Sequence, residues 1–363
     1  MTTLIALLLA TLSHAPDTLS AADVTVATPV TQEGADSGAF VVRLGADTVS
    51  VERYTRRGNR IQAVAAGRTP RTAVAWLVFT LAPDGSVATG AVGRGAQPTE
   101  ERAPPVAGTI PLAGGFWVPW ELAVRKAHAA NRDSTVVNLL AGPNARPTVF
   151  RRTAPGRFTF LSQFDQVLHA RTDAQGRLVS LETEGGGTSV ERVGWLDVEG
   201  MARTFAARDS GGTGLGPLSP RDTTTSTVQG ASISVSYGRP SLRARRLDVL
   251  VPPGQVWRAG SNDASTITTD RPLAFQGYIL APGTYSMFIQ ADAGRWTLIL
   301  NRQTGMSGLD RDPAQDLARI PMETRTNAAA TEKFTIEAAT RGDGGALVFK
   351  WGTVEAAAGF RVQ

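Results

Sequence analysis

The chain has 363 residues, none of them cysteine, and a formal net charge of +5. The lack of cysteine excludes disulfide bonds, thiolate zinc sites, iron–sulfur clusters and cysteine nucleophiles. With only three histidines, a multi-histidine metal site is not expected either. The length predicts about two domains, each large enough to bury its own core. Abundant glycine, proline, valine and threonine favour many short strands over helices.

The positive charge comes almost wholly from arginine, since 37 residues are basic and only Lys126, Lys333 and Lys350 are lysines. Arginine binds phosphate well, so a polyanion is one possible partner. The arginines are scattered singly, however, and neither an aromatic platform nor a basic recognition helix is present. We therefore expect no nucleic-acid partner and attribute the arginines to biased codon usage. One cluster, Arg239–Arg246, remains as a feature to test.

Residues 1–22 have the pattern of a secretory signal peptide. The apolar run Leu4–Leu12 has about the length of a signal-peptide core and is too short to span a bilayer. Small residues at 13–15 and 20–22 offer two cleavage sites. The segment before the run has no basic residue, so a buried strand or short helix is the alternative. We expect a periplasmic or secreted protein without a membrane span, because no later stretch is long and apolar enough.

Residues 23–208 are expected to form a β-rich N-terminal domain. Short β-branched runs alternate with turn signals such as Ala82–Ser86, where proline presets φ and glycine accepts a positive φ. Val118–Asn131 changes to helical spacing, with Pro119 suited to a first helical turn, and Val198–Ala207 is a shorter helix candidate. The pattern predicts an antiparallel meander or half-barrel with one helix. It is loosely similar to the half-barrels of lipoprotein-carrier proteins.

A second domain is expected after a linker. Residues 209–227 have a linker composition, rich in glycine, proline, serine and threonine. Residues 228–363 then show about eight short strands with little helix. This spacing is typical of a β-sandwich or a jelly roll. The fold class predicted for the whole chain is therefore mainly β, in two domains.

Several motifs follow one another in this second domain. They are SYGRPS at 236–241, GQVWRAGSNDAST at 254–266, LAPGTYSMF at 280–288, WTLILN at 296–301, DPAQDL at 312–317 and KFTI at 333–336. In this order they resemble the bacterial DUF2911 family, a domain of unknown function, over about residues 228–362. The resemblance implies a compact all-β domain, often found in exported proteins, and implies no activity. Family members often carry aromatic residues between the WTLILN-like strand and the DPAQDL tract. This chain has TGMSGL there, at 304–309, so a pocket shaped by that loop would be less aromatic.

The segment Trp257–Asp263 is the densest group of polar side chains. A guanidinium, an amide and a carboxylate beside an indole can hold a sugar or a carboxylate-bearing ligand. The structural alternative is that Arg258 pairs with Asp263, Trp257 fills the core, and the Asn and Asp side chains shape turns. Two residues at a nearby strand end would join the site if that end lies close. The predicted ligand-binding residues are Tyr237, Arg239, Trp257, Arg258, Ser261, Asn262 and Asp263.

Catalytic motifs are absent from the sequence. It contains no G-x-S-x-G, no S-x-x-K, no P-loop and no calcium loop. Glu121 and His128 are two helical turns apart, which makes an acid–base pair conceivable, but an ordinary helix surface is favoured. The favoured hypothesis is an exported, non-catalytic protein that binds a small molecule, glycan or envelope component without metal or cofactor. The alternatives are a carboxylate-based hydrolase of the cell envelope and a structural or interaction protein.

Overall fold

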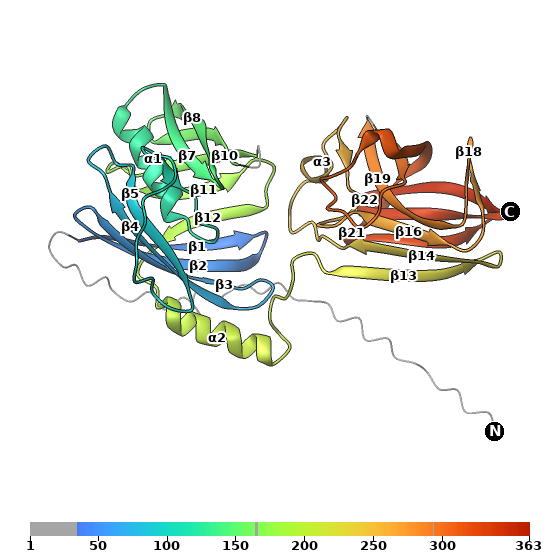
Figure 1. The fold of residues 1–363 in the computed structure, drawn as a ribbon, viewed down its shortest axis with the longest axis horizontal. Coiled ribbons are helices and arrows are strands. Elements are labelled where there is room, and N and C mark those ends of the chain that lie inside the picture. The colour runs from blue at the N-terminus through green and yellow to red at the C-terminus, as the bar shows by residue number, and fades with distance from the viewer. Residues whose placement is uncertain (1–34, 164–165, 293) are drawn as a thin grey trace.

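The computed structural model describes residues 35–163, 166–292 and 294–363 (Figure 1). The expected signal peptide, residues 1–22, lies outside the described residues. Two bodies built mainly from antiparallel strands follow one another along the chain, which confirms the predicted fold class. No helix of the described segments is long and apolar enough to cross a membrane.

The N-terminal body is a strongly curved sheet. Its strands are β1 (Ala35–Leu44), β2 (Asp47–Arg57), β3 (Arg60–Gly67), β4 (Ala73–Leu81), β5 (Val87–Arg94), β6 (Ile110–Pro111), β7 (Ser134–Ala141), β8 (Asn144–Ala154), β9 (Arg157–Leu161), β10 (Val167–Thr172), β11 (Leu178–Thr183) and β12 (Thr188–Val193). Their spatial order is β5-β4-β3-β2-β1-β12-β11-β10-β9-β8-β7-β6. The two edge strands of this sheet, β5 and β6, nearly meet. The N–H of Val87, the first residue of β5, donates to the carbonyl of Thr109, the residue before β6, at 3.0 Å. The predicted half-barrel is thus an almost closed barrel.

Helix α1 (Val118–Ala130) fills the interior of this sheet, where the sequence predicts a helix. Trp120, Val124 and Ala127 share one buried cluster with Phe40 of β1 and Phe150 of β8. Trp120 also stacks on a phenylalanine of β9, with ring centroids 5.5 Å apart. An apolar helix face against the concave side of a sheet is how this body buries its core.

A carboxylate from the sheet holds the start of α1. The helix has no side-chain cap of its own. Instead Glu52 of β2, which is fully buried, accepts hydrogen bonds from the N–H groups of Trp117 at 2.5 Å and Val118 at 3.1 Å. These N–H groups have no partner within the helix, so the oxygens of Glu52 satisfy donors that would otherwise be buried without an acceptor. Glu52 therefore fixes the helix inside the barrel.

A second buried carboxylate holds the middle of α1. Glu121 accepts hydrogen bonds from the hydroxyl of Tyr54 at 2.7 Å, from Arg125 at 2.7 Å and from Arg192 of β12. Arg125 also pairs with Asp36 of β1 at 2.7 Å. A buried charge is tolerated only when it is paired and hydrogen-bonded. The network therefore specifies both the depth and the rotation of α1.

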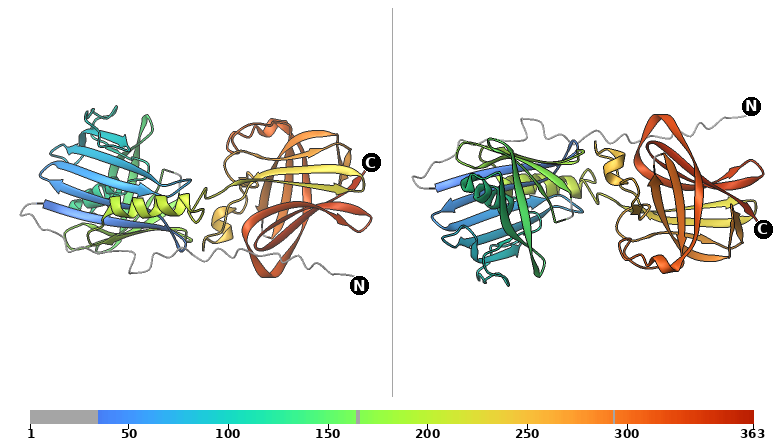
Figure 2. Two further views of the ribbon diagram at one scale, coloured as in Figure 1. Left: turned by 90° about the horizontal axis from the view of Figure 1, so that it is seen from below. Right: turned by 90° about the horizontal axis from the view of Figure 1, so that it is seen from above.

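A second helix covers the outer face of the sheet. Helix α2 (Val198–Ser210) lies across β1 to β4, as Figure 2 shows. Phe205 and Ala202 pack on the outward-facing Val51 and Val64. Asp197 caps the helix by accepting from the N–H of Gly200. The helix extends three residues beyond the Val198–Ala207 candidate, and the N-terminal body holds two helices among its described residues, where the prediction counted one.

The C-terminal body is one sheet folded into two layers. Its elements are β13 (Arg221–Val228), β14 (Ala231–Gly238), α3 (Leu247–Leu250), β15 (Val256–Trp257), β16 (Ser265–Thr269), β17 (Leu273–Phe275), β18 (Tyr278–Leu280), β19 (Gly283–Asp292), β20 (Arg295–Asn301), a 3₁₀ turn (Pro313–Gln315), β21 (Asp316–Arg341) and β22 (Gly344–Val362). The strand order is β13-β14-β16-β19-β20-β21-β22-β17-β18, and β15 adds to β19. The hydroxyl of Thr224 in β13 donates to the carbonyl of Ile336 in β21 at 3.2 Å. The first strand of the sheet thus lies on the sixth, which gives a sandwich.

The linker is shorter than its composition predicts. Residues 221–227, which we expected in the linker, form most of β13, and residues 209–210 end α2. Every second residue of β13 is exposed, and the strand pairs with β14 from Arg221 to Val228. A threonine-rich edge strand has the same composition as a polar linker, but its side chains alternate in exposure with a period of two residues.

The arginine cluster Arg239–Arg246 lies at the junction between the two bodies. Arg243 forms an ion pair with Asp47 in the β1–β2 turn, and both side chains are 13% exposed. The N–H of Arg246 donates to the carbonyl of Gly185 at 3.2 Å, and its guanidinium pairs with Asp248. Arg243 and Arg246 therefore serve contacts within the chain.

Replacing Glu52 with glutamine is expected to abolish a pH-dependent loss of stability. Burial raises the pKa of Glu52 from 4.5 to about 8, although the N–H groups of Trp117 and Val118 lower it. Between pH 4.5 and about 8 the folded state keeps a proton on Glu52 that the unfolded chain releases, so the free energy of unfolding falls as the pH rises. Relative to Glu52→Gln, the free energy of unfolding should fall by on the order of 1 kcal/mol per pH unit. Urea unfolding across the window measures this, and parallel pH profiles for the two proteins would contradict it.

Candidate functional site

Two of the sequence motifs meet in space at the junction end of the C-terminal body. Gly238, at the end of β14, touches the loop 259–262: a Cβ added there would lie 2.2 Å from the carbonyl oxygen of Ser261. Ser265 then holds this loop by donating to the carbonyl of Ala259 at 2.7 Å. The motifs SYGRPS and GQVWRAGSNDAST are therefore two sides of one structural unit.

A cavity of about 330 Å³ opens beside this unit. Trp257, Arg258 and Ser261 line it, which brings three of the seven predicted site residues together. The cavity also takes residues that the prediction did not include. The main additional residues are Arg245, Gln255, Leu309 and Trp351.

Two indole rings form one wall of the cavity. Trp257 stacks on Trp351 of β22, with centroids 5.4 Å apart and planes inclined by 18°. Phe334 supports the pair edge-on, at 4.9 Å from Trp257. Trp351 is buried and its N–H donates to the carbonyl of Glu332 at 3.1 Å. Trp257 is half-buried and is thus both part of the core and part of the cavity wall.

Arg258 carries the charge of the cavity. Its guanidinium makes no hydrogen bond or ion pair with any residue that the structure describes, so the expected pair with Asp263 is absent. Its side chain passes over Gly308, where a Cβ would lie 2.5 Å from the Arg258 Cδ. The glycine of the TGMSGL loop thus leaves room for the arginine to reach the cavity.

Arg245 adds a second guanidinium. Its Nε and Nη2 donate to the carbonyls of Leu242, at 2.9 Å, and Ser241, at 2.6 Å. It forms no ion pair with a carboxylate of the described segments. Burial lowers its pKa, as does neighbouring Arg243, while the charge of Glu332 acts in the opposite direction. None of the described residues that line the cavity is acidic. The described lining therefore carries two guanidinium groups, and Glu332 lies close enough for its charge to act on one of them, Arg245.

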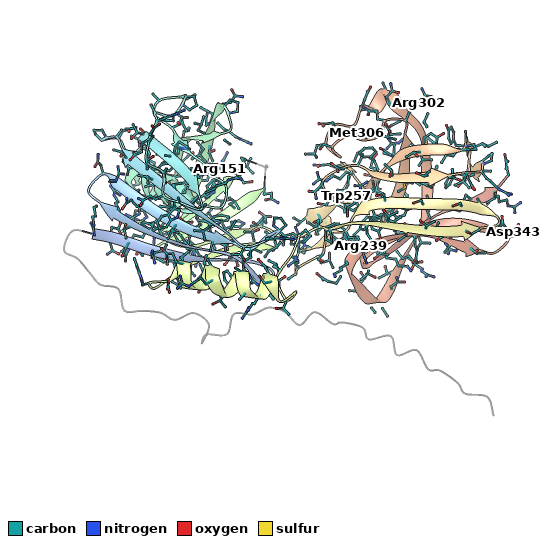
Figure 3. The ribbon with its side chains drawn as sticks, turned by 60° about the horizontal axis from the view of Figure 1, so that its bottom comes forward. Arg151, Arg239, Trp257, Arg302, Met306 and Asp343 are labelled. Carbon is teal, nitrogen blue, oxygen red and sulfur yellow. The ribbon has the colours of Figure 1, made fainter. Side chains whose placement is uncertain are left out.

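The other four predicted residues lie away from the cavity. Tyr237 is fully buried in the core, edge-on to Phe334. Arg239 pairs with Asp222 at 2.9 Å and bonds to β21. Asn262 and Asp263 are exposed beside the loop but do not line the cavity. Figure 3 shows Trp257 and Arg239 at the same end of the C-terminal body, on different elements.

The buried carboxylates of the described chain do not form a catalytic pair. Glu52 accepts from backbone N–H groups and Glu121 is bonded to arginines, as described above. Glu355, the third, pairs with Arg325 at 2.7 Å, which contributes to holding its pKa below the usual range. His128 lies 2.9 Å from the hydroxyl of Thr172 through its Nδ1, and so has a partner other than Glu121. Among the described residues no group of three or more acidic or histidine side chains is placed to hold a metal ion.

The tract at residues 312–317 has a structural role in this geometry. The fully buried Asn301 donates to the carbonyl of Asp312 and to the carboxylate of Asp316, both at 2.9 Å, and accepts from the N–H of Gln303. Arg311 completes the unit by pairing with Asp316. The motifs WTLILN and DPAQDL are therefore joined by a polar cluster around the buried Asn301 side chain.

Comparison with known families matches the C-terminal body. Residues 219–360 match the model of a family described as "Protein of unknown function (DUF2911)". The match begins just before β13 and ends in β22, which confirms the resemblance drawn from the motifs. A search of curated proteins finds no match.

Replacing Asn301 with alanine is expected to destabilise the C-terminal body. The change removes three hydrogen bonds from a fully buried side chain, to the N–H of Gln303, the carbonyl of Asp312 and the carboxylate of Asp316, which costs about 3 kcal/mol. Asn327→Ala, which removes one hydrogen bond of 3.3 Å to Glu355, serves as the control and should cost less than about 1 kcal/mol. Denaturant unfolding measures both, and equal losses would argue against the structural role.

Proposed function

We propose that the protein is an exported, non-catalytic binding protein whose C-terminal cavity takes a small anionic ligand with a ring face. A carboxylate-bearing saccharide of the cell envelope is the ligand class that fits best. The observation that carries this proposal is the unpartnered guanidinium of Arg258 beside the stacked indoles of Trp257 and Trp351. This proposal keeps the predicted ligand class and narrows its site to the residues that line one cavity.

The charge of the cavity favours an anion. Arg258 has no counter-ion within the described chain, and the hydrogen bonds of Arg245 go to carbonyl oxygens. A carboxylate can accept two parallel hydrogen bonds from one guanidinium, and such charge-assisted bonds are stronger than neutral ones. An anionic ligand would therefore supply a counter-charge for Arg258.

The aromatic wall and the size favour a ring. Ligand sites are lined largely by aromatic and apolar side chains, with a few polar groups that set orientation. Here the indole of Trp257 offers the apolar surface, and Ser261 and Gln255 offer polar groups. The volume of about 330 Å³ lies near the lower end of the range for such sites, which suits a small ligand.

The exported location rests on the apolar run Leu4–Leu12 and on the cleavage sites that follow it. A chain without cysteine gains nothing from disulfides in an oxidising compartment and depends on its two cores. Envelope saccharides are the anionic ring compounds that an exported protein meets, which links the location to the ligand class.

The two alternative functions have less support. A hydrolase of the carboxylate type needs two facing acids, one of them free to act, whereas Glu52, Glu121 and Glu355 are each tied to arginine or backbone. An interaction protein is expected to show a large exposed apolar patch. Val136 and Val149, exposed cross-strand partners on β7 and β8, form only a small patch.

Replacing Arg258 with glutamine is expected to weaken anion binding without changing the fold. Isothermal titration with glucuronate and galacturonate should show binding that exceeds that of neutral glucose and declines with added salt. Arg258→Gln should weaken it about tenfold to a hundredfold, since a charge-assisted hydrogen bond is lost. Arg302→Gln, an exposed arginine outside the cavity, is the matched control.

Two results would count against the site. Equal binding of the uronates and of glucose would show that charge does not select the ligand. An equal effect of Arg258→Gln and Arg302→Gln would show that only the net charge of the protein matters.

A further inference from the structure

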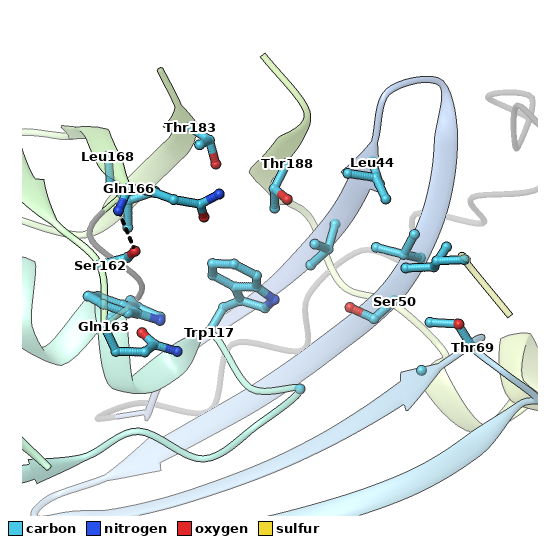
Figure 4. Close-up of a pocket in the computed structure, with 16 residues that line it drawn as sticks. Leu44, Ser50, Thr69, Trp117, Ser162, Gln163, Gln166, Leu168, Thr183 and Thr188 are labelled. Carbon is cyan, nitrogen blue, oxygen red and sulfur yellow. Dashed lines mark hydrogen bonds between the residues drawn. The ribbon is translucent and has the colours of Figure 1, made fainter. Parts of the chain in front are cut away.

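A second cavity, of about 420 Å³, lies in the N-terminal body, and Figure 4 shows residues that line it. Leu44 at the end of β1 and Thr188 at the start of β12 are part of its lining. The adjacent turns contact the C-terminal body, since Gly45 touches Arg243 and Gly187 touches Arg245. The sequence offered no sign of this cavity, because its walls come from strands far apart in the chain.

The lining of this cavity is apolar or neutral. Among the residues that the structure describes, the lining contains no aspartate, glutamate, lysine, arginine or histidine. The apolar residues are Val42, Leu44, Val49, Trp117, Trp120, Leu168 and Leu218, and the polar ones are Ser50, Thr69, Ser162, Gln163, Gln166, Thr183 and Thr188. All the polar groups are hydroxyls and amides. A charged ligand would therefore be buried there without a counter-ion, which is costly.

The polar groups are not spread evenly. Figure 4 shows Ser162, Gln163 and Gln166 on one side of the Trp117 indole, with Leu44 across the cavity. The N–H of Gln166 is bonded to the hydroxyl of Ser162 at 3.1 Å. The cavity thus has an amide-rich side and an apolar side.

One acceptor at the amide-rich side is unsatisfied. The side-chain oxygen Oε1 of Gln163 is buried and has no hydrogen-bond partner among the residues that the structure describes. A buried acceptor without a partner costs free energy, and most such atoms in proteins are paired. Because the oxygen is enclosed and its residue lines the cavity, a ligand that donates a hydrogen bond would pair it once the Gln163 amide turns toward the cavity.

We propose that this cavity binds a neutral amphiphile, with an apolar chain and a hydroxyl or amide head that donates to Gln163 Oε1. The apolar chain lies against Trp117, Trp120 and Leu168, and the head lies on the amide-rich side. The lining selects against carboxylate and ammonium heads, in contrast to the arginine-lined C-terminal cavity. This proposal does not depend on the proposed function of that cavity.

The test compares ligands of one chain length and different heads. Isothermal titration with 1-decanol, methyl decanoate, decanoate and decyltrimethylammonium, all below their aggregation limits, measures head selectivity. We expect decanol to bind at least about tenfold more tightly than either ion, because an unpaired charge cannot be buried. Equal or tighter binding of decanoate or of the ammonium compound, or no binding of decanol, would overturn the proposal.

A blocking variant locates the binding. Gly67 lines the cavity, its φ is not in the left-handed region, and an added Cβ meets nothing within 4 Å. Gly67→Leu should therefore fill the space and reduce decanol affinity at least about tenfold. Gly114 is equally open to a Cβ but does not line the cavity, so Gly114→Leu should leave the affinity unchanged. Equal affinities for the two variants would place the ligand elsewhere.

A second variant tests the acceptor and does not depend on filling the cavity. Gln163→Leu removes the unsatisfied oxygen and leaves a side chain of similar size. It should weaken decanol about threefold to tenfold, the value of one hydrogen bond. It should not weaken methyl decanoate, which has no donor. Equal effects on the two ligands would show that Gln163 is not the contact of the head group.

Discussion

The N-terminal body depends on carboxylates that lie where a core is normally apolar. Glu52 and Glu121 are 0% and 1% exposed, yet each is fully hydrogen-bonded, to the start of α1 and to Tyr54, Arg125 and Arg192. A buried ion pair adds little to stability over an apolar core, but losing one partner is costly. Such a network therefore specifies position more than it stabilises. It fixes α1 inside the sheet, and with it Trp117 and Trp120, which line the N-terminal cavity.

The C-terminal body fixes its cavity by close backbone approach. Gly238 allows β14 to touch the loop at Ser261, and Gly308 leaves room for Arg258. Asn301 holds the tract at 312–316. Several of the family motifs therefore have a packing role. Such motifs indicate a fold and do not indicate an activity. The residues that give the cavity its chemistry, Arg258 and the paired indoles, lie on this scaffold.

Short-range patterns in the sequence predicted the local structure. The turn at Ala82–Ser86 and helix α1 follow from proline, glycine and helical spacing. Contacts between distant residues carry no such signal: Glu52 meets Trp117 across 65 residues, and Trp257 meets Trp351. For the same reason the closure of the barrel, its cavity and the partner of Arg239 were not predictable.

The two cavities share the short linker. Leu218 lines the N-terminal cavity and the next residue, Ser219, lines the C-terminal one. Consecutive Cα atoms are about 3.8 Å apart, so the two cavities approach each other at this point of the chain. The ion pair between Asp47 and Arg243 spans the same junction. The linker therefore contributes to the walls of both cavities. Its composition is that of an ordinary flexible linker and does not indicate this role.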